Sequence, residues 1–374
     1  MDRNRKLLAA AVERIRSTSS RARVLVVLGL AALLTAVIIL ADPVDNFSFF
    51  KLGDGLDTPG SATIAATGSL ANGPNWGDLF TSTGALKDVQ PVLGRPDYRD
   101  FGGIGAAFTH DDLSTGSLVD HTIFTAGKFN DPVSAWTWGT GNVPAKDDIR
   151  NAYLYAVKNP VVSSDGTNHL MLYAGLERVV DNGDAHISFH LSQQYITPNS
   201  SGGFDGSRTV GDLAVSMDFS NGGTLGSVTV YKWNGSIYDQ VQAVGGEGCN
   251  TDHTVCAFNN GVPITGIQGD AIDVNAFTEI GVDVTALIPN GGALPCFPDV
   301  MFVSRSSQST TATLKDFAAS SIKLCGLAVL KQCSDAISGQ NISFTGSIRN
   351  VGAVPLTGLT VGDDQPGSLI LPLA

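Results

Sequence analysis

The chain has 374 residues, of which 43 are glycine, 16% are charged and 7% are aromatic, and its formal net charge is -12. Ordinary glycine usage would give about 26, so the excess favours many turns over long helices. Apolar residues make up 43% of the chain, which excludes wholesale disorder.

The net charge is divided unevenly along the chain. Residues 1–23 carry seven Lys and Arg against Asp2 and Glu13, a balance of +5, and the remainder carries 16 basic against 33 acidic side chains, a balance of -17. A body this acidic repels phosphate backbones and anionic lipid. The composition therefore argues against nucleic-acid binding and against a peripheral membrane patch.

An uncharged apolar run, VLVVLGLAALLTAVIILA, occupies residues 24–41, directly after the basic residues 1–23. This order directs a chain out of the cytoplasm and leaves its basic end on the cytoplasmic side. The run exceeds the usual signal-peptide core of about 7–15 residues and approaches the roughly 20 needed to span a bilayer. A cleaved signal peptide and a retained anchor helix both stay open. In either case we expect an exported, secreted or cell-surface body that touches the membrane only through residues 24–41, if they are uncleaved.

After Asp42, short alternating runs are separated by Gly, Asn, Asp and Pro, the pattern of an antiparallel β-sandwich, here of jelly-roll type. In chain order, residues 146–157 show helical spacing and predict one helix, which Pro160 would end. Residues 184–191 predict a strand with Ala185, Ile187, Phe189 and Leu191 toward the core and an opposite face that is solvated or functional. Residues 211–233 predict a hairpin that turns at Asn221-Gly222-Gly223.

Five cysteines lie in the last third of the chain: Cys249, Cys256, Cys296, Cys325 and Cys333. They do not have zinc-site spacing, and in an oxidising compartment bridges are favoured. Proximity predicts Cys249–Cys256 and Cys296–Cys325 disulfides and leaves Cys333 over. Free buried thiols are the alternative.

A composition break near residues 330–335 divides the exported part in two. We expect a β-sandwich domain over residues 42–329 and the start of a second β domain over residues 330–374. About 45 residues are too few to close a sandwich of some 100 residues.

Two resemblances to bacterial proteins follow from the motifs. The tail, with Asn350-x-Gly352, Pro355-Leu356-Thr357, Leu359-x-Val361 and Asp363, resembles the first half of the Ig-like conserved repeat domain of bacterial cell-surface proteins, which implies a spacer role. Residues 100–330 resemble an uncharacterised domain that precedes such repeats in secreted bacterial proteins. The matching pieces are Trp136-x-Trp138, Lys146-Asp147-Asp148-Ile149 with Ala152-Tyr153, Asp181 to Ala185, Gly211-Asp212-Leu213, Asp218-Phe219 with Gly222-Gly223, and Leu314-Lys315-Asp316-Phe317 before Cys325-Gly326. This second resemblance implies no activity.

Candidate ligand sites are few. Asp181, Asn182 and Asp184 around Gly183 offer the hard oxygen ligands that calcium prefers, although a tight turn explains the same residues. Trp136 and Trp138, on one strand face, offer a platform for a sugar, although core packing is the commoner fate of tryptophan. His186 and His190 lie too far apart along a strand to share one metal ion, so we expect solvated polar side chains there.

Catalytic motifs do not emerge from the sequence. It has no G-x-S-x-G elbow, phosphate loop or H-E-x-x-H helix,. The adjacent acids Asp111-Asp112 and Asp147-Asp148 do not form a facing pair, although acids from distant strands could; the second pair fits the start of a helix. We therefore expect a non-enzymatic structural or adhesion-type protein without a resident cofactor, whose partner is a cell-surface protein or a glycan. A calcium-dependent carbohydrate-binding module and a polysaccharide or ester hydrolase are the alternatives.

Overall fold

The computed structural model describes residues 75–87, 103–111, 113, 119–158, 169–287, 295–321, 327–333 and 344–350. The predicted segments 1–23 and 24–41 lie outside these ranges. Within the part of the chain that is described, no helix is long and apolar enough to cross a membrane.

The described chain is mainly β, and its strands pair antiparallel. One sheet has six strands. In spatial order they are β1 (Gly103–His110), β4 (Ile149–Lys158), β5 (Leu170–Arg178), β16 (Phe277–Asp283), β13 (Val255–Asn259) and β12 (Gly248–Cys249).

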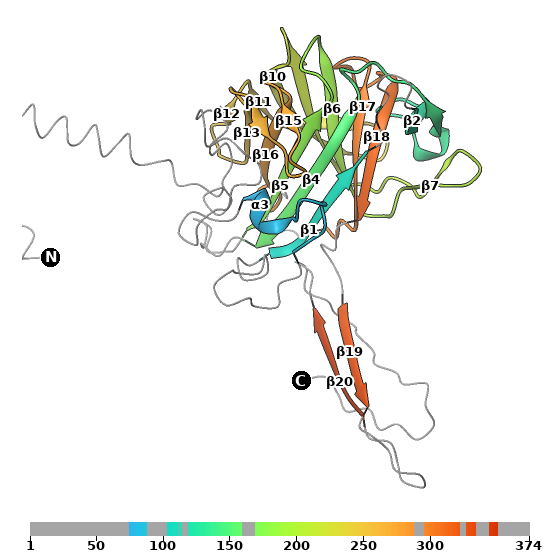
Figure 1. Ribbon diagram of the computed structural model, residues 1–374. Coiled ribbons are helices and arrows are strands. Elements are labelled where there is room, and N and C mark those ends of the chain that lie inside the picture. The colour runs from blue at the N-terminus through green and yellow to red at the C-terminus, as the bar shows by residue number, and fades with distance from the viewer. Residues whose placement is uncertain are drawn as a thin grey trace, which may run out of the picture. The chain divides into compact units, whose positions relative to one another are not determined.

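The second sheet has eight strands and contains the predicted hairpin. In spatial order they are β11 (Tyr238–Gly245), β10 (Thr224–Trp233), β9 (Leu213–Ser220), β6 (Ala185–Ser192), β17 (Asp299–Arg305), β18 (Leu314–Ser321), β2 (Asp120–Ala126) and β3 (Thr137–Gly141). The hairpin predicted over residues 211–233 is confirmed as β9 and β10, with Asn221, Gly222 and Gly223 all at positive φ in the turn. Figure 1 labels most of the strands of the two sheets.

Several short elements complete the described part. They are helix α3 (Trp76–Leu79), the 3-10 turn η2 (Val133–Ala135), and the strand pairs β7 (Thr197–Pro198) with β8 (Phe204–Asp205) and β14 (Ile264–Thr265) with β15 (Ala271–Ile272). Asn75 caps α3 through a reciprocal capping box with Asp78, which satisfies backbone N–H groups at the start of a helix too short to be stable alone.

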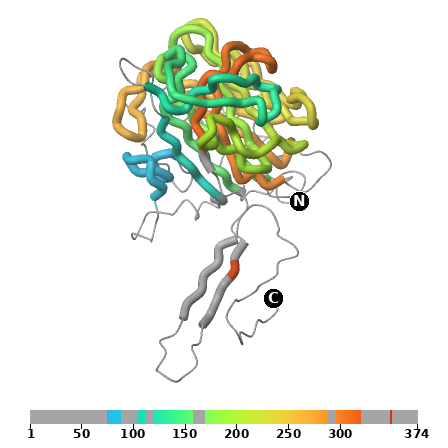
Figure 2. Tube along the Cα trace, turned by 90° about the vertical axis from the view of Figure 1, so that its right-hand side faces the viewer, coloured from blue at the N-terminus to red at the C-terminus, as the bar shows by residue number. Residues whose placement is uncertain are grey.

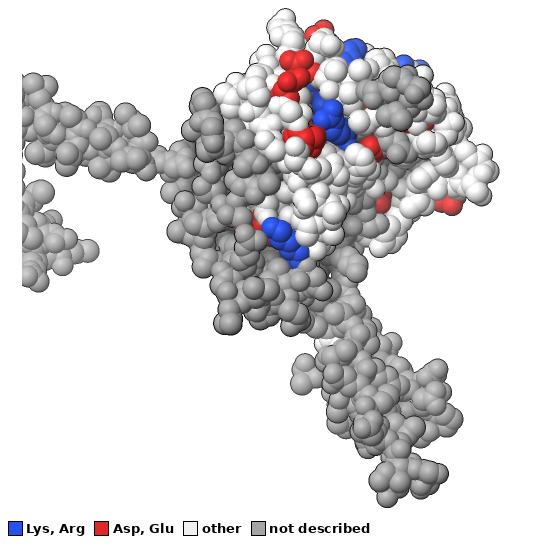
Figure 3. All heavy atoms as spheres, in the orientation of Figure 1, with Lys and Arg blue, Asp and Glu red and all other residues white. Residues whose placement is uncertain are grey.

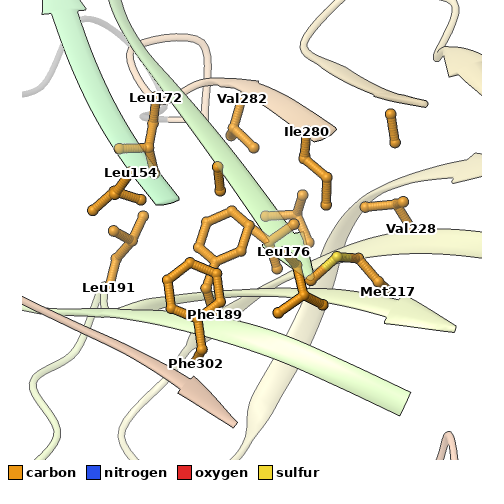
Figure 4. Close-up of a cluster of buried hydrophobic side chains, with 14 of the residues drawn as sticks. Leu154, Leu172, Leu176, Phe189, Leu191, Met217, Val228, Ile280, Val282 and Phe302 are labelled. Carbon is orange, nitrogen blue, oxygen red and sulfur yellow. The ribbon is translucent and has the colours of Figure 1, made fainter. Parts of the chain in front are cut away.

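The two large sheets share one hydrophobic core. Figure 4 shows Leu154, Leu172 and Ile280 from the six-stranded sheet together with Phe189, Met217 and Phe302 from the eight-stranded one. Each of these side chains is at most 1% exposed. The alternation predicted for residues 184–191 is confirmed, because Ala185, Ile187, Phe189 and Leu191 all lie in this core.

Both sheets are also covered on their outer faces. Helix α3 and the β14–β15 pair lie over the six-stranded sheet (Figure 2), where Trp76 and Phe80 contact Tyr153. Phe129 and Trp136 from connecting segments, together with Phe204 of β8, cover the eight-stranded sheet. Gly175 permits the close approach on the first face, since a Cβ there would lie 3.2 Å from atoms of Phe277, Trp76 and Tyr153.

The outer layers overturn two sequence predictions. Residues 149–158 form β4 and not a helix. Ala152, Leu154 and Ala156 face the inter-sheet core while Tyr153, Tyr155 and Val157 face the α3 layer. A strand apolar on both faces loses its alternation and imitates helical spacing.

The second correction concerns the polar face of β6. His186, Ser188 and His190 are 7%, 0% and 3% exposed, so the predicted solvation of this face is wrong. The physical reason is the aromatic cover: the Phe129 ring lies 5.1 Å from the His190 ring. Nothing within β6 itself encodes that cover.

The C-terminal described segments form their own antiparallel pair, β19 (Leu327–Cys333) with β20 (Phe344–Asn350). The domain boundary predicted between residues 329 and 330 falls inside β19. The remaining residues of the predicted Ig-like tail lie outside the described ranges.

Candidate functional site

Buried carboxylates gather at one place where the two sheets meet. Asp111 follows β1 and Asp148 precedes β4 of the six-stranded sheet, while Asp120 begins β2 and Asp316 lies in β18 of the eight-stranded sheet. One oxygen each from Asp120, Asp148 and Asp316 lies within 4.8 Å of the others. All three residues are 0% exposed, and Asp111 is 3% exposed. We call these four side chains the carboxylate cluster.

The hydrogen bonds of the cluster leave specific oxygens without donors. Asp316 Oδ2 accepts from the Ile149 backbone N–H at 2.8 Å, and Asp120 Oδ1 accepts from the Thr122 backbone N–H at 2.7 Å. The other oxygen of each, Asp316 Oδ1 and Asp120 Oδ2, is buried and accepts no hydrogen bond. Such an oxygen is costly to bury without a donor or a cation.

Thr122 joins two members of the cluster. Its Oγ1 lies 2.7 Å from Asp111 Oδ1 and 2.7 Å from Asp120 Oδ1. A hydroxyl has one proton and donates to one of these oxygens at a time. One hydroxyl therefore serves two carboxylates, Asp111 and Asp120.

Burial and like charge act together on Asp316. Burial raises the pKa of Asp316 well above its ordinary value, and the negative charges of Asp111, Asp120 and Asp148 raise it further, whereas the Ile149 N–H lowers it. The adjacent Asp147 lies outside the cluster and forms an ion pair with Lys146, whose Nζ lies 3.9 Å from Asp147 Oδ1. Burial still raises the Asp147 pKa, while Lys146 and His186 act in the opposite direction.

A second buried polar group lies on the outer face of the eight-stranded sheet. His186 Nδ1 lies 2.9 Å from Asp218 Oδ1, and Arg305 donates to Asp218 and to the Ser216 hydroxyl. His190 Nε2 lies 3.1 Å from Ser188 Oγ. Burial lowers the pKa of His190 well below its ordinary value, helped by the Arg208 and Arg305 charges. These side chains bond to one another, as buried polar groups of a stable core do.

A third group lies beneath the α3 layer. Glu177, 0% exposed, accepts hydrogen bonds from Tyr153 and, at 2.7 Å, from Asn151 Nδ2. Burial raises the pKa of Glu177 to about 7, and the hydrogen bond from Tyr153 counteracts this. Both oxygens of this carboxylate have donors, in contrast to Asp316 and Asp120.

The predicted calcium ligands lie in a surface turn between β5 and β6. Asn182 and Asp184 are exposed and Gly183 has φ +72°. Lys146 Nζ donates to the Asp184 carbonyl, and the charge of Asp181 acts on Arg178. The turn therefore already has two cations of the protein beside it.

The two tryptophans predicted as a sugar platform do not present a common exposed face. Trp136 is 2% exposed and lies among Phe124, His190 and Phe204. The Trp138 ring is partly buried and donates to the Asn199 carbonyl at 3.1 Å. Trp136 is thus part of the aromatic cover of the eight-stranded sheet.

The Cys249–Cys256 disulfide links β12 to β13, where the two residues pair in register. Cys296 is also disulfide-bonded, but Cys325 lies outside the described residues, so the second pairing stays a prediction.

The carboxylate cluster was missed as a unit by the sequence predictions. Asp111 and Asp148 belong to the two adjacent acid pairs, and Asp316 to the Leu314–Phe317 motif, but Asp120 carries no local signal. The only available hint was that acids from distant strands could meet.

No family model, curated protein or solved structure matches this chain.

Proposed function

We propose that the chain is an exported structural or adhesion-type surface protein with a non-catalytic β-sandwich body. The observation that supports this best is the enclosure of the carboxylate cluster. Asp120, Asp148 and Asp316 are 0% exposed, and a carboxyl that acts on a polysaccharide or an ester has to reach the substrate. Such enclosure supports a role of these side chains inside the fold and argues against contact with a soluble substrate.

The compartment is supported by two independent features. The basic and apolar segments over residues 1–41 have the order of an export signal or anchor,. The Cys249–Cys256 bridge is typical of proteins that fold under oxidising conditions. We place the body at the cell surface or in the medium.

The type of β-sandwich and the nature of residues 330–374 are part of the same proposal. We assign the sandwich to the jelly-roll type and residues 330–374 to a partial Ig-like spacer repeat, which the antiparallel β19–β20 pair supports. On the face shown in Figure 3, acidic and basic side chains lie among a larger area of neutral residues. Such a mixed surface suits a protein or glycan partner better than a nucleic acid.

Export is tested with the full chain carrying a C-terminal tag in a bacterial host. Protease added to intact spheroplasts is expected to remove the tag, and Cys249 and Cys256 are expected to resist alkylation until a reductant is added. A protected tag with freely alkylated cysteines would contradict export.

The non-catalytic role needs a separate assay. The purified chain is expected to leave a panel of polysaccharides and esters intact and to bind cells or glycans without turnover. Turnover of any substrate in the panel would overturn this part of the proposal.

A further inference from the structure

The carboxylate cluster is built from four segments that are far apart in the sequence. Asp111 and Asp316 are separated by more than half of the chain, yet both flank Asp120 and Asp148 at the junction of the two sheets. The β2–β3 hairpin joins the rest of its sheet at this place: β2 pairs with β18 at a single residue pair, Ile123 with Asp316. The cluster therefore lies where the strand pairing is sparsest.

Two oxygens of this cluster have no hydrogen-bond donor. Asp316 Oδ1 and Asp120 Oδ2 are buried in residues that are 0% exposed, and neither accepts a hydrogen bond. By contrast, Asp299, a buried carboxylate of β17, is not part of the cluster and accepts a hydrogen bond from the Ile196 N–H. Buried carboxylates that lie close together, two of them with an oxygen that has no donor, have the properties of a cation site.

We propose that Asp120, Asp148 and Asp316 bind one calcium ion that joins the two sheets, with Asp111 held beside them by Thr122. The ligand oxygens lie within 4.8 Å of one another. Calcium–oxygen distances of about 2.3–2.6 Å place opposite ligands up to about 5 Å apart. The ion supplies the positive charge that the buried oxygens lack. It also links Asp120 of β2 and Asp316 of β18 to Asp148, which directly precedes β4.

The donor set selects among metals. All the ligands are carboxylate oxygens, whereas zinc sites are built mostly from nitrogen and sulfur. Magnesium keeps several waters and needs ligands at about 2.0–2.1 Å, which suits an open site better than one whose residues are 0% exposed. Calcium fits both the oxygen ligands and the enclosure.

The site differs from the calcium site predicted in the surface turn. That turn has Lys146 bonded to its backbone and Arg178 beside Asp181, so a divalent ion there would meet two positive charges. The proposal also does not depend on the structural role of the protein, since a calcium ion in this cluster would stabilise an enzyme equally well.

The first test uses the full chain, treated with EDTA and then freed of the chelator. Calorimetric titration with CaCl2 is expected to show one binding event with a dissociation constant below about 1 mM. Two millimolar CaCl2 is expected to raise the midpoint of thermal unfolding by at least about 2 °C, and the same concentration of MgCl2 by less than half of that. No heat and no shift would overturn the proposal, and an equal shift with MgCl2 would overturn the assignment to calcium.

Isosteric variants locate the ion. Asp316→Asn and Asp120→Asn remove charge from the cluster, so each is expected to abolish the calcium shift while leaving the midpoint in EDTA equal to or above that of the parent chain. The control variants Asp299→Asn and Asp184→Asn are expected to keep the full calcium shift. If Asp316→Asn does not fold, Asp120→Asn decides. A calcium shift that survives in the folded cluster variant, or one that disappears in Asp184→Asn, would overturn the proposal.

Hydrogen exchange provides a local readout. Removing calcium is expected to accelerate amide exchange in β2 and β3 at least tenfold, while exchange in β9 and β10 changes little. Equal acceleration in both hairpins, or none in either, would contradict a clamp at the β2–β18 junction.

Discussion

The buried carboxyl of Asp299 is expected to make a pH-dependent contribution to the free energy of unfolding, and the sign of this contribution follows from its raised pKa. This β17 carboxyl is 2% exposed, and burial raises its pKa from 3.8 to about 7, against a lowering effect of the hydrogen bond from the Ile196 N–H. Between about pH 4 and 7 the folded chain keeps a proton that the unfolded chain releases. The contribution of Asp299 to the free energy of unfolding therefore falls as the pH rises through this range and levels off above it.

The size of the effect follows from the pKa difference. About three pKa units at about 1.4 kcal/mol each give about 4 kcal/mol as an upper value. Asp299→Asn removes the titration but keeps an oxygen that accepts the Ile196 N–H, which lies 3.2 Å from Asp299 Oδ2. The variant is expected to be more stable than the parent chain at pH 8, by up to this amount, and to show a shallower pH dependence.

Urea unfolding of the full chain in EDTA, followed by tryptophan fluorescence at pH 5, 6, 7 and 8, measures this difference. Asp252→Asn, at an exposed position, controls for the loss of one negative charge and is expected to stay within about 0.5 kcal/mol of the parent. Parallel pH curves for Asp299→Asn and the parent, or a variant less stable at pH 8, would refute the reasoning.

Three further substitutions test the packing and the disulfide by the same unfolding assay. Gly175→Ala is expected to lower the free energy of unfolding by about 1–3 kcal/mol, because the new Cβ would lie 3.2 Å from atoms of three neighbouring residues,. The control Gly245→Ala, whose Cβ would have nothing within 4 Å, is expected to leave the stability unchanged. Equal effects of the two substitutions would contradict the close packing under α3. Phe189→Ala, at a 0% exposed core position, is expected to cost about 3–5 kcal/mol, and a loss below 1 kcal/mol would contradict the inter-sheet core. Replacing Cys249 and Cys256 by Ala is expected to cost about 2 kcal/mol, from a loop with a sequence separation of seven,. The destabilising effect of a reductant is expected to become smaller in this variant, where Cys296 remains disulfide-bonded.

Sequence patterns predicted the strands whose two faces differ and the turns that need positive φ. The strand over residues 184–191 and the hairpin at Asn221-Gly222-Gly223 carry their signal locally, in alternation and in glycine. Strand β4 carries the opposite signal, because Tyr153 and Leu154 are both buried, one on each face. A second layer over each sheet is a tertiary feature that no local window encodes.

The carboxylate cluster shows the same limit for sites. Asp148 is marked in the sequence only as half of an acid pair and as part of the Lys146–Ile149 motif, and Asp120 has no other acid beside it. Their proximity to Asp316 arises from the strand order of two sheets, and strand order depends on long-range pairing. The local motif at Asp181–Asp184 looked more like a calcium site because its oxygens are adjacent in sequence, whereas the structure places Lys146 against it.

A crystal structure of the full chain grown with CaCl2 tests the inter-sheet calcium site most directly. The account predicts one anomalous difference peak enclosed by Asp120, Asp148 and Asp316, with ligand distances of about 2.3–2.6 Å. A calcium-saturated crystal with no peak in the carboxylate cluster, or with its peak in the 181–184 turn instead, would contradict it.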